Sequence, residues 1–325
     1  MSESAAIPDE FADLVSFAIA SQQAATTASA AASSDEAEFA RAAELIRSAD
    51  VLLVGAGAGM GVDSGLPDFR GPEGFWKAYP AFKGKRFGEF FGFAPCACCL
   101  TVFTEQMSNP HWFETDPSIA WGFFGHRLHL YRGATPHGGF AILKRWLEEK
   151  PDSFVFTSNV DGQFLKAQTV PEEQLVECHG SIMWLQCTDP NCLQPIWQTG
   201  DLHVDVDPET IKATSTPLPT CPTCARLARP NILMFGDFSW HEERTAVQEK
   251  RFAAWQRRNR QKRVVAVEMG AGLAIPTVRI TCEENSAALV RINPREPQVH
   301  RDADVALAHG ALYALTRIDE LLRSS

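Results

Sequence analysis

The sequence contains no apolar run of the length that a membrane-spanning helix needs, about 18 residues. Its first residues, MSESAAIPDEF, also lack the basic segment followed by an apolar one that directs a chain to export. Positive charge is not in surplus either, since the formal net charge is −10 and the isoelectric point is near 5.4. We therefore expect an intracellular protein, in the cytoplasm with the nucleus as the alternative, that binds neither membranes nor nucleic acid directly.

The nine cysteines are an odd number, which argues against a complete disulfide framework. Four of them form two spaced pairs, Cys187-x4-Cys192 and Cys221-x2-Cys224. Four thiolates in two such clips are typical of a closed tetrahedral zinc site, and because no position is left for water the zinc would be structural. Chance placement of these four cysteines is the alternative.

A further cluster comprises Cys96, Cys98 and Cys99. We interpret these three as buried apolar cysteines, with a second metal or a redox role as the alternative.

Large apolar side chains are scarce in residues 20–36, so we expect residues 1–36 to be a flexible extension. Beyond them, apolar runs alternate with helical patterns, which predicts an α/β fold with a doubly wound, parallel, Rossmann-like sheet over residues 37–325. Residues 182–230 interrupt the alternation and would form a smaller zinc-binding module. The predicted strands are 51–54, 153–157, 174–178, 231–235, 264–267 and 289–292, and the predicted helices are 35–46, 119–131, 138–149 and 310–322, with a charged helical stretch within 238–263.

A glycine-rich turn, Gly57-Ala58-Gly59, directly follows the first predicted strand. Residues without side chains let backbone N–H groups approach a pyrophosphate at a helix N-terminus, although a tight turn without a ligand is the alternative. The spacing does not satisfy G-x-G-x-x-G, and no acidic residue ends a second strand about 20 residues on, so a hydride-transfer enzyme is disfavoured. The loop that follows places an acid, an aromatic ring and a guanidinium in consecutive positions: Asp68, Phe69 and Arg70.

Two more polar groups follow predicted strands, where open parallel sheets bind their ligands. Ser158-Asn159-Val160-Asp161 comes after one strand, and His179 after the next. A histidine at such a place titrates near neutral pH and can act as a general base. The alternatives are an Asx-rich turn for the first group and a buried core histidine for the second.

Together and in this order, the turn at 57–59, the Gly65–Arg70 loop, the Thr157–Gly162 motif and His179-Gly180 resemble the motifs of the sirtuins, NAD-dependent protein-lysine deacylases. The resemblance covers most of the chain after residue 50. It implies that Asn159 holds the nicotinamide ribose, Asp161 the carboxamide, and that Phe69 shields the anomeric carbon. The full set of cofactor-binding residues that it implies is Gly57, Ala58, Gly59, Asp68, Phe69, Arg70, Ser158, Asn159, Asp161, Gly270 and Asn293.

By the same resemblance, the acyl-amide oxygen of a substrate lysine attacks the anomeric carbon of NAD as nicotinamide leaves. His179 then deprotonates a ribose hydroxyl, and the products are free lysine and O-acyl-ADP-ribose. The segment Arg229–Asp237 resembles the strand that pairs with the substrate peptide, with Phe235 and Gly236 at the acyl-lysine tunnel. Arg127 falls where desuccinylating members carry an arginine, but Phe124 replaces their tyrosine, so a solvated helix arginine is the favoured interpretation.

Two positions depart from the family pattern. Ser158 replaces a glutamine, and Gly270-Ala271-Gly272 replaces a GTS triplet, which predicts a weaker grip on NAD or a shifted acyl preference. The sequence thus predicts an NAD-dependent protein-lysine deacylase, acting on acetyl-lysine in protein substrates and carrying one structural zinc. The alternatives are a protein ADP-ribosyltransferase or NAD hydrolase and, from another class, a non-catalytic NAD-sensing scaffold held together by zinc.

Overall fold

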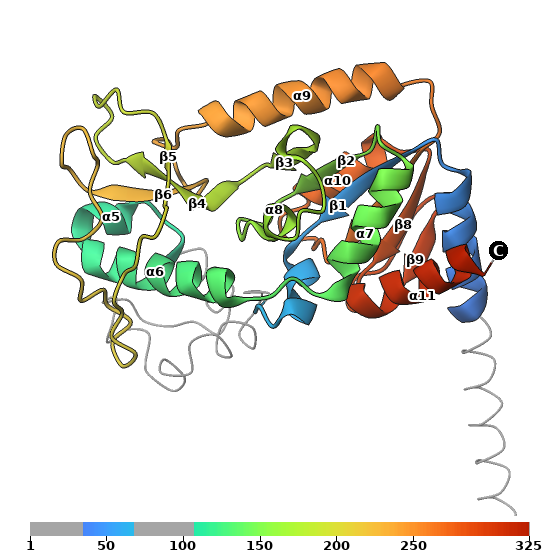
Figure 1. Ribbon diagram of the computed structural model, residues 1–325, viewed down its shortest axis with the longest axis horizontal. Helices are drawn as coiled ribbons and strands as arrows, with labels where there is room; N and C mark the ends of the chain where they lie inside the picture. The colour runs from blue at the N-terminus through green and yellow to red at the C-terminus, as the bar shows by residue number, and fades with distance from the viewer. Residues whose placement is uncertain (1–34, 68–106, 325) are drawn as a thin grey trace, which may run out of the picture.

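Six parallel strands form the larger of two sheets in the computed structural model, which describes residues 35–67 and 107–324 (Figure 1). The strand order is β3-β2-β1-β7-β8-β9, and all neighbours pair in parallel. Because the order departs from β1 in both directions, a topological switch point lies between β1 and β7. The predicted doubly wound sheet is confirmed. The strands are β1 (Val51–Ala56), β2 (Phe154–Thr157), β3 (Leu175–Glu177), β7 (Val264–Met269), β8 (Ala288–Ile292) and β9 (Val305–Leu307).

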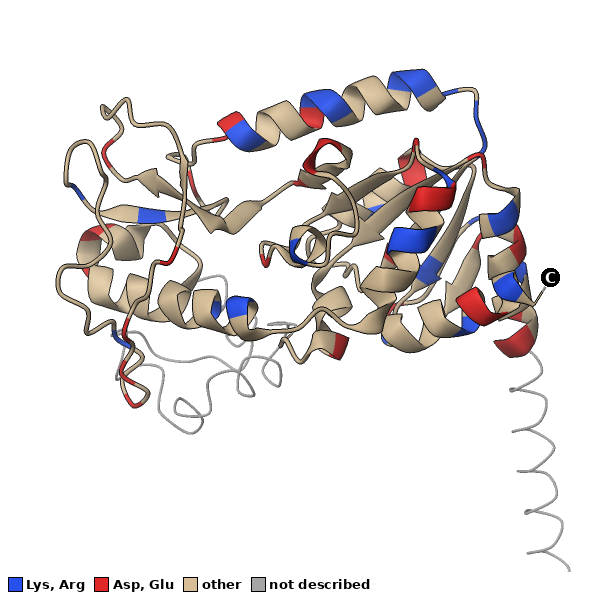
Figure 2. Cartoon of the chain, viewed as in Figure 1, with Lys and Arg blue, Asp and Glu red and all other residues tan. Residues whose placement is uncertain are grey.

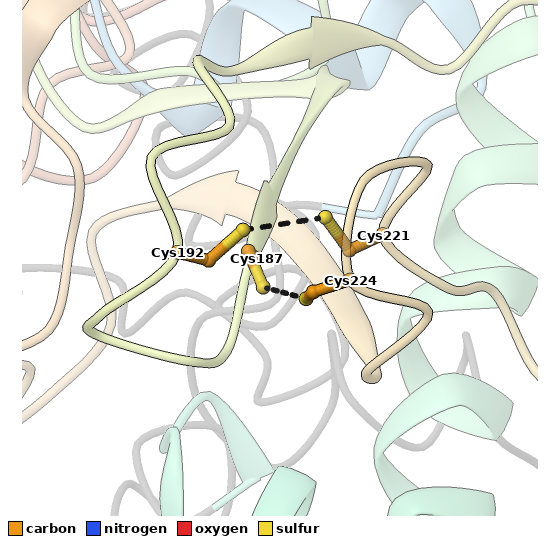
Figure 3. Close-up of side chains that lie close together, drawn as sticks. All are labelled: Cys187, Cys192, Cys221 and Cys224. Atoms are coloured by element: carbon orange, nitrogen blue, oxygen red, sulfur yellow. Dashed lines mark hydrogen bonds between the residues drawn. The ribbon is translucent and has the colours of Figure 1, made fainter.

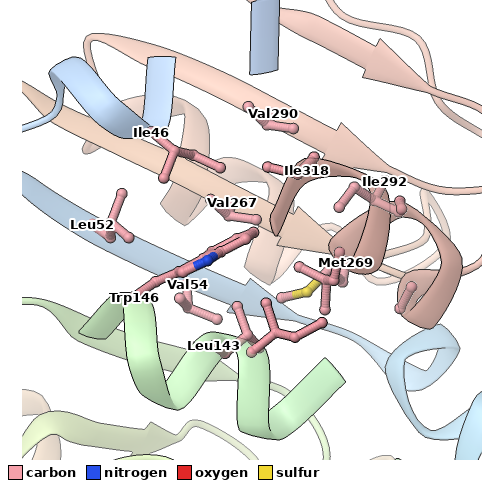
Figure 4. Close-up of a cluster of buried hydrophobic side chains, with 14 of the residues drawn as sticks. Ile46, Leu52, Val54, Leu143, Trp146, Val267, Met269, Val290, Ile292 and Ile318 are labelled. Carbon is pink, nitrogen blue, oxygen red and sulfur yellow. The ribbon is translucent and has the colours of Figure 1, made fainter. Parts of the chain in front are cut away.

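Helices cover both faces of this sheet, which explains why its strands read as nearly continuous apolar runs. On one face lie the helical residues 35–48, α7 (Gly138–Glu149) and α11 (Ala311–Arg323). The other face packs against α9 (Glu243–Asn259) and α10 (Thr277–Glu284). Figure 4 shows Ile46, Leu143 and Trp146 meeting strand residues such as Val54 and Val267 in the first of these cores. The predicted helical face is confirmed, since its four apolar residues are all buried: Phe39, Ala42, Ala43 and Ile46.

A second, antiparallel sheet has the order β5-β4-β6. Its strands are β4 (Gly180–Cys187), β5 (Trp197–Gln198) and β6 (Ala228–Ile232), and we call residues 180–232 the three-stranded module. Apolar side chains of α5 (His111–Thr115) and α6 (Pro117–Gly133) pack against it. The short helices are η1 (Ala58–Ser64), α8 (Gln163–Lys166) and η3 (Glu172–Gln174). None of the described helices is long and apolar enough to cross a membrane.

The predicted strand at 231–235 is wrong in its bounds, because β6 begins at Ala228 and ends at Ile232. Pro230 is tolerated since β6 lies at the edge of its sheet. After Ile232 the chain turns away: Gly236 has φ +65°, and Phe235 N–H donates to the Ser108 carbonyl. Strands β4, β5 and β9 were not predicted. Residues 1–34 of the expected extension, the residues Asp68 to Arg70 and the cysteines at 96, 98 and 99 lie outside the described residues.

Candidate functional site

A cavity of about 710 Å³ lies at the carboxyl ends of the parallel strands. Its size falls within the range of ligand sites, about 300–1,000 Å³, and its place at the switch point is where such sheets bind ligands. Most of the residues singled out in the sequence line it: Ala58, Gly59, Arg127, Ser158, Asn159, Asp161, His179, Phe235, Gly270 and Asn293. Gly57 and Gly236 are not part of this lining. The sequence thus identified residues that come together from seven separate segments.

Glycines at the first turn allow two backbone segments to touch. A Cβ on Gly57 or Gly59 would lie 2.7 or 2.6 Å from backbone atoms of residues 270–271, closer than side chains tolerate. Gly57 N–H donates to the Met269 carbonyl at 2.9 Å, and Gly59 N–H to the Gly270 carbonyl at 3.1 Å. Both N–H groups are therefore satisfied inside the protein, which differs from the expectation that they face a pyrophosphate. Close packing of the turns after β1 and β7 is what requires glycine here.

The carboxyl end of β2 supplies Asn159 and Asp161. Asn159 Nδ2 donates to the Gly57 carbonyl at 3.0 Å, which joins this loop to the glycine-rich turn. Asp161 is 8% exposed, and its Oδ1 accepts the Gln163 N–H at 2.9 Å. Burial raises the pKa of Asp161 to about 6, although the Gln163 hydrogen bond and the charge of Arg127 act in the opposite direction. The cavity therefore holds a carboxyl group that changes its charge near neutral pH.

His179 follows β3 and is held by its backbone on both sides. Cys178 N–H donates to the Thr157 carbonyl at 2.9 Å, and Leu233 N–H donates to the His179 carbonyl at 3.0 Å. Burial lowers the pKa of His179, while a hydrogen bond to the Ser158 backbone acts in the opposite direction. The neutral imidazole is the form that a general base requires, so this environment suits proton abstraction.

Arg127 projects into the cavity from α6, and its interpretation as a solvated arginine is wrong. The residue is 9% exposed. Its guanidinium lies 5.3 and 5.4 Å from the ring centroids of Phe123 and Tyr131, and its Nη2 donates to the Tyr131 hydroxyl at 2.6 Å. Tyr131 also lines the cavity and was not predicted, because the family pattern concerns the residue three positions before Arg127 and not the one four positions after it. The spacing from i to i+4 on a helix was the available signal.

The strands on the other side of the switch point contribute Asn293 and His309. Asn293 Nδ2 donates to the Ala271 carbonyl at 2.8 Å, and its Oδ1 accepts the N–H groups of residues 295 and 296 at 3.0 Å. It therefore shapes the turn after β8. His309 follows β9, lines the cavity and pairs with Asp35 at 2.8 Å. Because β9 was not predicted, nothing in the sequence pointed to His309.

The two cysteine pairs meet at one point in the three-stranded module (Figure 3). All four sulfurs lie within 4.8 Å of one another, with Sγ–Sγ distances of 3.5 Å for Cys187–Cys224 and 3.7 Å for Cys192–Cys221. A tetrahedron with Zn–S bonds of about 2.3 Å has edges of about 3.8 Å, so the sulfurs fit zinc. None of the four lines the cavity. A zinc ion held here would stabilise the module and leave no coordination position open.

The fold and the site define an α/β protein with a ligand cavity at the switch point of a parallel sheet and a four-cysteine cluster in a separate module. Residues 97–254 match the family model described as Sir2 family. The chain is 25% identical to an NAD-dependent protein deacylase of Aquifex aeolicus (strain VF5) over 273 residues, which cover 82% of this chain and 93% of the relative. It is 24% identical to an NAD-dependent protein deacylase of Pyrococcus furiosus, over 86% of this chain and 96% of that protein.

Solved structures agree with this assignment at the level of the fold. A Sir2 homolog–NAD complex aligns with a TM-score of 0.60 and 21% identity, over 87% of this chain and 93% of that one. A Sir2 variant with a deacetylated p53 peptide and 3'-O-acetyl ADP ribose aligns with a TM-score of 0.56 and 19% identity, over 86% and 96% of the two chains. The chain is thus similar in sequence to NAD-dependent protein deacylases and in fold to Sir2 structures, and about half of it matches the Sir2 (sirtuin) family model.

Proposed function

We propose that this chain is an NAD-dependent protein-lysine deacylase. The observation that carries the proposal is the cavity itself, which brings the glycine-rich turn, the Asn159–Asp161 loop and His179 to one edge of the sheet. The sequence relatives are NAD-dependent protein deacylases, and the chain spans nearly their full length. A purely scaffolding role would not need a buried carboxyl group and a neutral imidazole in the same cavity.

The cavity residues fit NAD, which when bound would supply an electrophilic anomeric carbon and nicotinamide as the leaving group. Asp161 and Asn159 would hold its nicotinamide end, because they lie on the loop that contacts the glycine-rich turn. His179 would take the proton of a hydroxyl group, since burial keeps its imidazole neutral at physiological pH. The apolar part of the lining, which includes Leu66, Val160 and Ile292, would exclude water from the reacting groups.

The substrate peptide would enter beside Phe235. This side chain is 39% exposed and lines the cavity, just beyond the end of the edge strand β6. An edge strand can pair with an extended peptide through main-chain hydrogen bonds, which gives affinity with little sequence preference. Phe235 would then contact the acyl-lysine side chain, with Gly236 providing the turn next to it.

Acetyl-lysine is the expected substrate, and one observation favours a second acyl class. Arg127 places a positive charge in the cavity, where it could pair with an acyl group that ends in a carboxylate, such as succinyl. The charge is already engaged by Tyr131 and lies close to Asp161, so an acidic acyl group would compete with these partners. Arg127→Gln should reduce turnover of succinyl-lysine peptide more than turnover of acetyl-lysine peptide, whereas equal effects would assign Arg127 to support of the cavity wall.

The deciding experiment measures nicotinamide release from NAD with and without acetyl-, succinyl- and long-chain-acyl-lysine peptides. We expect release that depends on the peptide and formation of O-acyl-ADP-ribose in the mass spectrum. His179→Ala should reduce this by about 100-fold or more, the usual contribution of a general base. Release without any peptide would identify an NAD hydrolase, and ADP-ribosyl-protein without O-acyl-ADP-ribose would identify a transferase.

A further inference from the structure

Helix α9 contacts each polar group of Glu177, the residue two positions before His179. Gln248 Oε1 accepts the Glu177 N–H at 3.1 Å, and the Thr245 hydroxyl donates to the Glu177 carbonyl at 3.3 Å. Arg244 Nη1 lies 2.6 Å from Glu177 Oε2 as an ion pair. The side chains of Arg244 and Glu177 are 8% and 2% exposed, so this ion pair lies largely out of water.

Arg244 also connects Glu177 to two other parts of the chain. Its Nη2 lies 3.0 Å from Glu172 Oε1 in η3, and its guanidinium lies 5.2 Å from the ring centroid of Trp184 in β4. Figure 1 shows α9 running from the side of the three-stranded module to the side of the six-stranded sheet. The guanidinium therefore lies where β3 leads into β4, and the two residues between these strands in the sequence are Cys178 and His179.

The other contacts of this stretch are made by backbone. Cys178 is fixed to β2 through the Thr157 carbonyl, and the His179 carbonyl is fixed to Leu233. Loss of Arg244 would leave the Glu177 carboxylate buried without its counter-ion, where burial raises the pKa of Glu177 and the charge of Asp161 acts in the same direction. The carboxylate would then either take up a proton or move toward water, and either change displaces the end of β3 from which His179 is presented.

We propose that Arg244 is a positioning residue for His179, acting through Glu177 and Trp184. This inference rests on the proposed deacylase function, in which His179 is the general base. Arg244 is not among the described residues that line the cavity, so it acts without touching NAD or the acyl-lysine. Its effect is on the placement of the imidazole relative to the hydroxyl that it deprotonates, a distance to which rates are steeply sensitive.

The test compares Arg244→Gln with the parent in the full chain, using NAD and the acyl-lysine peptide that the parent turns over best. We expect kcat to fall by about 10- to 100-fold while KM for NAD changes less than about threefold, because the cofactor contacts stay in place. The pKa of His179, followed by NMR of its ring C–H, should rise in the variant as the imidazole gains access to water. Arg244→Lys keeps the charge and should recover part of kcat.

A matched control lies on the same helix, since Figure 2 shows basic residues along the length of α9. Arg258 pairs with Asp152 near the other end and is 58% exposed, so Arg258→Gln removes the same charge and also an ion pair. It should leave kcat and the His179 titration unchanged. Unchanged kcat and an unchanged titration in folded Arg244→Gln would overturn the proposal, as would equal losses in both variants. If Arg244→Gln does not fold, the same readouts in Arg244→Lys decide. An inactive parent would instead count against the deacylase function.

Discussion

The two sheets of this protein are held together by different means. The six-stranded sheet is covered on both faces by helices, and its strands are buried along their whole length except at β9. The three-stranded module has a strand of only two residues, β5, and a register shift between β4 and β6. Besides its apolar packing on α5 and α6, it has two specific ties: the four cysteines within it, and the buried ion pair of Arg229 with Asp237, which follows β6.

This difference indicates how each region should fail. Apolar burial is distributed over many side chains, so a single substitution in the large sheet removes only part of its stability. A metal site concentrates the folding free energy of a small unit in four bonds, so the loss of one ligand removes most of it. The proposed catalytic residues lie where the two regions meet, so activity should fall when either region is damaged.

The largest effect should come from removing the metal. Cys221→Ser, or chelation of zinc, should unfold the three-stranded module and abolish deacylation, because structural zinc contributes about 10 kcal/mol or more to small domains. Hydrogen exchange should become fast in residues 180–232, while β1 and β7 stay protected. Cys282→Ser is the matched control, since Cys282 is buried against the large sheet. Cys282→Ser should destabilise the large sheet and leave the zinc content at one ion. If the amides of the three-stranded module stay protected in metal-free protein, the prediction is wrong.

A substitution in the other region should give the converse result. Leu143 is fully buried in α7 against the large sheet (Figure 4). Leu143→Ala should lower the free energy of unfolding by about 3 kcal/mol, the usual cost of the cavity that it leaves. Zinc content should not change. Denaturant unfolding with a metal assay tests both statements, and loss of zinc from folded Leu143→Ala would show that the two regions are not independent.

The contrast also explains what the sequence could predict. Apolar runs and helical periodicity arise from local burial, so the parallel sheet and the helix at 138–149 were predicted closely. The zinc site could be predicted because four cysteines in two closely spaced pairs are typical of such sites. Strand β9 has three residues, and the bounds of β6 depend on Pro230 at an edge and on the Arg229–Asp237 pair, none of which leaves a periodic pattern.

In the cavity, the motif residues were predictable and their surroundings were not. Asn159, Asp161 and His179 stand after strands, so their meeting follows from parallel topology. The burial of Arg127 depends on where α6 lies relative to the loop that carries Asp161, and the use of the Gly57 and Gly59 N–H groups depends on the turn after β7. Both are contacts between segments distant in sequence, which patterns along the chain do not reveal.

Asp161→Asn, in the cavity between the two regions, should change stability and activity in opposite directions. In the folded chain, the pKa of Asp161 is raised to about 6 from its ordinary value of 3.8. Between these two pH values the folded chain therefore keeps a proton that the unfolded chain has lost. Stability is therefore lost as pH rises through this window, and by pH 8 the ionised carboxylate costs about 3 kcal/mol. The variant should be more stable than the parent at pH 8, with the advantage gone near pH 4, yet nicotinamide release should fall by about 100-fold. A lower melting temperature than the parent at pH 8 would contradict this expectation.

The smallest effect concerns a loop of the three-stranded module that packs on α6. His129 stacks on His203 with ring centroids 4.3 Å apart, and the His129 ring accepts the Val204 N–H at 3.4 Å. Burial, with the nearby His203 and Arg132, lowers the pKa of His129. A lowered histidine pKa means that the unfolded chain takes up the proton first, so stability present at neutral pH is lost as pH falls below about 6.5.

His129→Gln keeps an acceptor for Val204 and removes this titration. Because the ring is partly exposed and solvent screens the charge, the difference in pH dependence should be less than about 1 kcal/mol. Hydrogen exchange of residues 202–206 between pH 7 and pH 5 measures it locally, and the exposed His300→Gln serves as the control. The parent loop should open more at pH 5 than the His129→Gln loop. Equal opening in the parent and in His129→Gln would mean that apolar contacts hold the loop, such as that of Val204 with Gly125. The loop would then be stabilised in the same way as the large sheet.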